Sequence, residues 1–200
     1  MKKINKNEPD FYKEFAEQDK PRSWGDLSRE IGYDVRKYML EEEQHFQCAY
    51  TEVHIDPDPG NSHVDHFRKQ SLFPKSVFKW NNLLTACNSE HYGAKFKDKN
   101  IRGKEDYQYL INPVKEEPQR YFSYSMTGEI LADEDDRKGQ FTIDSFNLND
   151  RSLVERRKMI VCEVMAMCNQ LSLDQLIHDI GSFESFIRVI HADLKNIEHG

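Results

Sequence analysis

Residues 48–95 read CAYTEVHIDPDPGNSHVDHFRKQSLFPKSVFKWNNLLTACNSEHYGAK and contain two short polar clusters. The first cluster is His63-Val64-Asp65-His66, and the second extends from Asn82 to His91 and Lys95. An aromatic-rich loop separates them. Histidine, carboxylate and amide side chains near lysines are the residue types that metal-assisted hydrolysis uses. This stretch is therefore the candidate site.

The local pattern predicts two strands and a helix in this stretch. Turn-forming residues at 56–61 would join antiparallel strands at Tyr50–Ile55 and Ser62–Phe67. A bend near the end of the second strand is needed to bring Asp65 and His66 to one site, because neighbouring strand residues point to opposite faces. A helix is expected to begin at Asn81-Asn82 and to end near Gly93.

The rest of the chain is predicted to be mainly helical. Residues 1–22 are expected to form an extended arm, and a helix is expected from Ser23 to about Gln47. Together with residues up to 104 that helix would make the core, and residues 105–200 would form a mixed and then helical region. That region carries strand-like pieces at Tyr107–Ile111, Tyr121–Tyr124 and Phe141–Phe146, followed by helices from Arg151, at Leu173–Ile180 and at Ser182–Lys195.

Composition limits the classes of protein that fit. The chain has 200 residues, a net charge of −7 and four cysteines, so it is neither a disulfide scaffold nor a protein that coats nucleic acid by charge alone. No run approaches the ~20 apolar residues that span a bilayer, and the N-terminus lacks the apolar segment of a secretory signal. We expect a cytoplasmic protein with no membrane partner.

Positive charge gathers around the candidate site. Residues 63–104 contain nine Lys or Arg and three acids, which makes this segment +6 within an acidic chain. A polyphosphate substrate needs such a basic region, because each neutralised phosphate releases counterions. A solvated basic loop is the alternative interpretation.

Phosphodiester hydrolysis needs at least one base, one or two metal ligands and basic residues that bind the substrate. A histidine suits the base, and Mg²⁺ needs only one or two protein ligands. Asp65-His66, Asn82, His91 and Lys95 can supply these groups.

These residues resemble the HNH endonucleases. The resemblance lies in Asp65-His66-Phe67-Arg68, in Trp80-x-Asn82-Leu83-Leu84-x-x-Cys87, and in His91 nine residues after Asn82. The wider chain, over most of residues 40–160, is similar to the HNH component of Septu-type and retron-associated anti-phage systems. The resemblance implies an α+β fold, mainly helical, around a ββα-metal core with C-terminal helices.

The resemblance also implies roles for single residues. His66 would be the general base and Asn82 would hold and orient the loop that contains it. Asp65 and His91 would be ligands of Mg²⁺ or Mn²⁺. Lys95 resembles the basic residue that would face the phosphate. Position and charge alone make Arg68 and Lys69 candidate phosphate contacts, and His63, two residues before Asp65, is a candidate for supporting the site residues or for contacting substrate.

The chain departs from its relatives at a zinc knuckle. Relatives often carry two Cys-x-x-Cys pairs, whereas this chain has Cys48-x-x-Thr51 and Cys87-x-x-Glu90. Structural zinc normally takes four Cys or His ligands, so we expect no structural zinc. Weak binding by the two cysteines with Glu90 or His54 stays open.

Two functions compete. The first is a metal-dependent HNH endonuclease that cuts DNA in a defence complex and is controlled by a partner, which the resemblance implies is an ABC/SMC-like ATPase. The second is a weakly active or inactive subunit that docks on this ATPase, which the eroded knuckle favours. A zinc-finger-like DNA-binding module fails on its ligand count.

Overall fold

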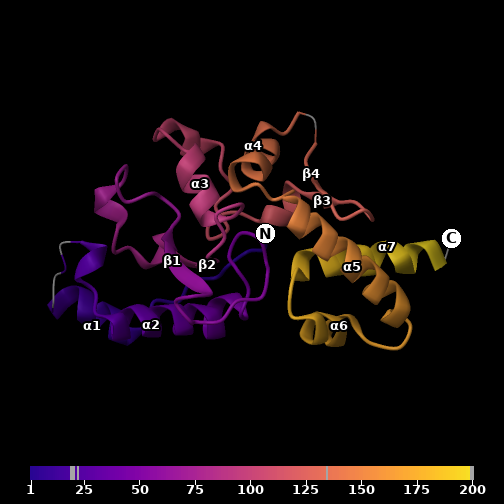
Figure 1. Cartoon of the computed structure of the whole chain (residues 1–200), viewed down its shortest axis with the longest axis horizontal. Helices are drawn as coiled ribbons and strands as arrows, with labels where there is room; N and C mark the ends of the chain where they lie inside the picture. The colour runs from indigo at the N-terminus through magenta and orange to yellow at the C-terminus, as the bar shows by residue number, and fades with distance from the viewer. Residues whose placement is uncertain (19–20, 22, 134, 199–200) are drawn as a thin grey trace.

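The computed structural model describes residues 1–18, 21, 23–133 and 135–198 and has an α+β fold. The strands are β1 (Ser62–His66), β2 (Leu83–Cys87), β3 (Ser123–Tyr124) and β4 (Ile130–Leu131). The helices are α1 (Asp10–Gln18), α2 (Arg29–Tyr38), α3 (Ala94–Asn100), α4 (Arg137–Phe146), α5 (Arg151–Met167), α6 (Leu173–Ile180) and α7 (Glu184–Glu198). In Figure 1, α1 and α2 lie below β1 and β2 at one end, and α5, α6 and α7 gather at the other.

The strand that pairs with β1 is β2. The two are antiparallel, with Ser62 opposite Cys87, Asp65 opposite Leu84 and His66 opposite Leu83. The predicted pairing of Ser62–Phe67 with Tyr50–Ile55 is therefore wrong, and so is the helix predicted from Asn81. Every residue of Leu83–Cys87 is buried, and a short apolar run of this kind does not distinguish a strand from a buried helix. The helix comes later, as α3 after Gly93.

Residues 46–55 instead form a tight turn beside the sheet. The Cys48 N–H donates to the Val53 carbonyl, and the Ile55 N–H donates to the Phe46 carbonyl at 2.8 Å. Glu52 takes a positive φ of 58° at the tip. The knuckle-like turn expected at Cys48–Thr51 is thus present, although it joins no strand pair.

The helix expected from Ser23 begins later. Ser23 and Asp26 form a capping box on a single 3₁₀ turn, and α2 begins after Ser28, whose hydroxyl accepts from the Ile31 N–H. A π-helical turn, Met39–Gln44, extends α2. It delivers Gln44 to the edge of β2, where the side-chain amide exchanges two hydrogen bonds of 2.8 Å with the Thr85 backbone.

The expected extended arm at residues 1–22 is wrong at residues 10–18, whereas residues 1–9 form neither helix nor strand. Residues 10–18 form α1, and the side chains of Tyr12 and Phe15 are buried in a second apolar cluster with Val35, Met39, Trp80 and Leu83. Met1 and Ile4 are buried in the main core. Residues 19, 20 and 22 of the expected arm lie outside the described residues. Burial of these aromatic side chains stabilises the packing of the segment against the rest of the protein.

The region after residue 104 is more helical than predicted. Phe141–Phe146 belongs to α4, and Glu105–Gln108, which overlaps the start of the predicted strand at Tyr107–Ile111, is a 3₁₀ turn. Ser123–Tyr124 is a strand as expected. The predicted helices from Arg151 and at Leu173–Ile180 are confirmed as α5 and α6. Asp150 caps α5, and Gly181 ends α6 with φ 65°. Within the described ranges, no helix has the length and apolar character needed to cross a membrane.

Candidate active site

The end of β1 opens onto a cavity of about 430 Å³. The residues that line it are His63, Val64, Asp65, His66, Lys69, Gln70, Ser71, Lys95 and Asp98. Two predicted phosphate contacts, Lys69 and Lys95, thus share a cavity with the predicted base His66. The cavity combines a titratable imidazole with positive charge, which is the chemistry that a phosphodiester requires.

His66 is held in one orientation. Its Nε2 lies 3.0 Å from the Val77 carbonyl oxygen, which only accepts, so Nε2 carries the proton. Nδ1 then has the lone pair and accepts from the Gln70 amide at 3.2 Å. The Trp24 ring packs edge-on against the imidazole at 4.7 Å. Burial, with a contribution from the Lys97 charge, lowers the pKa of His66, so its neutral form is present at pH 7.

The carboxylate of Asp65 is buried and has hydrogen-bond partners within the protein. It is 4% exposed, and its carboxylate accepts a hydrogen bond from the Tyr50 hydroxyl. The Lys97 ammonium of α3 lies 2.9 Å from Oδ2 and 3.2 Å from Oδ1. Burial alone would raise the pKa of Asp65, but the charge of Lys97 and the hydrogen bonds from Tyr50 and Lys97 lower it. Asp65 is thus an ionised group with a fixed cationic partner.

Lys97 is fully buried, although the sequence interpretation placed it in an exposed basic stretch. Burial favours the neutral amine, yet the charges of Asp65 and Asp98 outweigh it and raise the pKa of Lys97. A signal for this position was present in the sequence. Ala94, Lys97 and Ile101 are spaced as one face of a helix, so Lys97 stands between two apolar residues that are buried.

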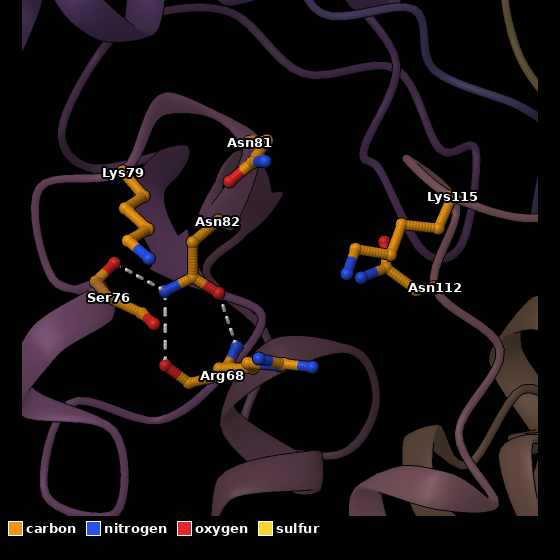
Figure 2. A pocket seen from close by; sticks show the side chains of 7 residues that line it. All are labelled: Arg68, Ser76, Lys79, Asn81, Asn82, Asn112 and Lys115. Atoms are coloured by element: carbon orange, nitrogen blue, oxygen red, sulfur yellow. Dashed lines mark hydrogen bonds between the residues drawn. The ribbon is translucent and has the colours of Figure 1, made fainter.

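Asn82 is hydrogen-bonded to both ends of the loop between β1 and β2. Its Oδ1 accepts from the Arg68 N–H at 2.8 Å, and its Nδ2 donates to the carbonyls of Ser76 and Arg68 at 3.0 and 3.2 Å (Figure 2). The two ends of the loop that follows His66 are thereby tied together. Val77, whose carbonyl holds the His66 ring, follows Ser76 directly.

Replacing Asn82 with Ala is expected to lower the free energy of unfolding by about 1–3 kcal/mol, because it removes three partly buried hydrogen bonds made by a buried side chain. Asn81→Ala is the matched control, since this neighbouring amide is exposed and its loss should cost less than about 0.5 kcal/mol. Urea denaturation followed by circular dichroism measures both. Equal stabilities of the two variants would contradict the role of Asn82 in holding the loop.

Not all of the remaining predicted site residues line this cavity. His91 is exposed in the loop before α3 and is not among the residues that line the cavity. Arg68 lines a different cavity, described below. His63 lines the same cavity as Asp65, and its buried Nδ1 has no hydrogen-bond partner among the described residues. Lys95 pairs with Glu90 at 3.0 Å.

A divalent cation does not fit the site as its residues are placed. Within the described ranges, no three His, Cys, Asp or Glu side chains come close enough to hold a metal ion. Asp65, the predicted first ligand, already binds an ammonium and a hydroxyl, and His91 lies elsewhere. The predicted ligand pair Asp65 and His91 is therefore not assembled in this conformation.

The remnant of the zinc knuckle is packed into the core. Cys48 and Cys87 are buried free cysteines, with the Cys87 N–H 3.4 Å from Cys48 Sγ. Thr51, at the position of a missing ligand, lies 3.9 Å from Cys87 Sγ. Burial would raise the pKa of Cys48, but hydrogen bonds from Cys87 and Thr51 lower it, and the pKa of Cys87 is raised by its bond to Cys48. The turn is held by packing and hydrogen bonds.

Comparison with known proteins gives two relatives and no family model that matches. The chain is 23% identical to Septu protein PtuB of Bacillus mycoides (strain KBAB4) over 176 residues, which covers 76% of this chain and 58% of that protein. It is 36% identical to Septu protein PtuA of the same strain over 78 residues, covering 39% of this chain and 11% of that protein. The chain thus spans little more than half of one relative and about a tenth of the other. It is a distant homologue of the Septu proteins, and its similarity to PtuB extends over most of its length.

Proposed function

We propose that the chain is an HNH-type endonuclease that hydrolyses phosphodiester bonds of DNA in a Septu-type anti-phage defence system. The single observation that carries the proposal is His66, whose Nε2–H is fixed on Val77 and whose Nδ1 lone pair accepts from Gln70 beside a cavity that Lys69 and Lys95 also line. The order strand, strand, helix in β1, β2 and α3 is the order that an HNH core has, and the similarity to PtuB supports the defence role.

In this proposal Nδ1 of His66 takes the proton of the attacking water, which replaces the Gln70 amide at that lone pair. The Val77 carbonyl keeps the ring in the required tautomer and stabilises the imidazolium that forms. Lys69 and Lys95 line the same cavity and would bind the phosphate. The resemblance implies Mg²⁺ or Mn²⁺ as the cation, but Asp65, its predicted ligand, is bound to the Lys97 ammonium in this conformation.

A second cavity extends the basic surface. Arg68, Ser76, Lys79, Asn81, Asn82, Asn112 and Lys115 line it (Figure 2). The described lining residues thus include three cations and no carboxylate. We infer that this cavity contacts the nucleic-acid backbone beside the scissile phosphate, since Arg68 and His66 lie on the same short segment.

Replacing Lys79 and Lys115 together with Ala is expected to weaken DNA binding without regard to sequence. The slope of log affinity against log salt should become shallower by about 2, because each lysine that neutralises a phosphate contributes about 0.9. Fluorescence anisotropy over a salt series measures the slope. Lys158→Ala is the control, because Lys158 is an exposed residue of α5, and it should leave the slope unchanged. A double variant with the parental slope would show that this cavity does not contact the DNA.

We propose that the chain acts with a second Septu protein, which the resemblance implies is an ABC/SMC-like ATPase. An unregulated nuclease would damage the DNA of its own cell, so the chain alone should be a weak enzyme. An inactive docking subunit is the second candidate. It is favoured by the hydrogen bond between Lys97 and Asp65, which occupies the predicted metal ligand. A nuclease assay of the parent and of His66→Gln, with and without the partner, separates the two candidates.

A further inference from the structure

The Lys97 ammonium lies in a cage of oxygen atoms. Its Nζ is 2.9 and 3.2 Å from the two carboxylate oxygens of Asp65 and 3.1 and 3.3 Å from the carbonyls of His66 and Phe67. Oδ1 of Asp98 is 3.3 Å away. Five oxygens thus surround a group that has only three N–H donors. This arrangement coordinates a cation rather than forming a single ion pair.

The cage has the composition of a divalent cation site. Its donors are two carboxylates and two backbone carbonyls, which are the oxygen ligands that Mg²⁺, Mn²⁺ and Ca²⁺ prefer. The two carboxylates carry a charge of −2, whereas the ammonium supplies +1. A divalent ion would balance the carboxylates fully.

The cage is also next to solvent. Lys97 itself is fully buried, but Asp65 and Asp98 both line the cavity that contains His63 and His66. The side chain of Asp98 is 39% exposed, although its Oδ1, which faces Lys97, is buried. The cage thus lies beside the cavity, and a cation reaches the carboxylates only after Lys97 and Asp98 move locally.

We propose that Lys97 is an internal competitor for the cation position at Asp65 and closes this position to divalent ions in the resting chain. Its ammonium stands at the carboxylate that would otherwise hold the metal, so a divalent ion binds only when Lys97 is displaced from Asp65. The same contact sets the position of Asp65, which pairs with Leu84 one step before His66 on β1. The proposal concerns cation binding alone and does not depend on nuclease activity.

The test is Mn²⁺ binding to the full chain, measured by electron paramagnetic resonance of free Mn²⁺ and by thermal melting. The parent should show no Mn²⁺ binding that depends on Asp65, so that the parent and Asp65→Asn give the same titration. Lys97→Met removes the charge and should bind one Mn²⁺ at least tenfold more tightly than the parent. Adding Asp98→Asn to Lys97→Met should abolish that gain.

Lys97→Gln is the second variant, because its amide keeps a donor for Asp65 and preserves the fold if Lys97→Met does not fold. It should bind Mn²⁺ more tightly than the parent and melt at a higher temperature when Mn²⁺ is added. Tight parental binding that Asp65→Asn removes would overturn the proposal. So would a folded Lys97→Met or Lys97→Gln that binds Mn²⁺ no better than the parent.

Discussion

Asp65→Ala is expected to lower the free energy of unfolding by about 3–5 kcal/mol, because it leaves the Lys97 ammonium buried without its main partner. The loss comes from an uncompensated charge rather than from a missing contact. Lys97 is fully buried, and two of its closest oxygens belong to Asp65. Urea denaturation of the purified variants measures the change.

The double variant Asp65→Ala/Lys97→Met should recover at least half of this loss. Replacing both members of a buried ion pair with apolar groups is often neutral, whereas removing one member is costly. Asp98→Ala is the matched control, since this carboxylate is 39% exposed and its removal should cost less than about 1 kcal/mol. A double variant less stable than Asp65→Ala would contradict the ion-pair account.

His66→Gln is expected to reduce phosphodiester cleavage by ~10²–10⁴-fold, the usual cost of removing a general base. The Gln amide can still donate to the Val77 carbonyl, so the loop should keep its conformation. His178→Ala on α6 is the matched control and should cleave at the parental rate, because His178 lies on a different cavity. Thermal melting confirms that both variants are folded.

The pH dependence follows from the same base. His66 must be neutral to accept a proton, and burial holds its pKa below the usual value of about 6.5. The cleavage rate should therefore rise with pH below about 6.5 and be flat by pH 7. A rate that still rises steeply between pH 7 and 8 would show that a different group is the base.

The helices after Asp150 were predicted from local signals, namely caps and helical spacing. The α+β class was implied by the resemblance, and the structure has it. Asn82 does contact the loop around His66, whereas the functional roles of both residues stay predictions. The partner of β1 was mispredicted because Leu83–Cys87 is buried throughout, with Thr85 its one polar residue, and carries no periodicity that separates strand from helix. Leu83–Cys87 is a strand because it pairs with β1, and this pairing between distant residues is not visible in the local pattern.

Lys97 was missed for a different reason. Composition places it among the basic residues 95–104, which are normally solvated. Only the fold brings α3 against β1 so that a lysine on the apolar face of the helix meets Asp65. Tyr50, which donates to the same carboxylate, is 15 residues from Asp65 in the chain, and no spacing rule connects them.

The most direct test of the proposed nuclease is cleavage of supercoiled plasmid DNA by the purified chain together with the proposed Septu partner, with single-stranded DNA and RNA as parallel substrates. We expect phosphodiester cleavage of DNA that is stronger with the partner and is lost in His66→Gln. Cleavage of DNA by His66→Gln at the parental rate would contradict it, and so would intact DNA after incubation of the folded parent with the partner and Mg²⁺ or Mn²⁺.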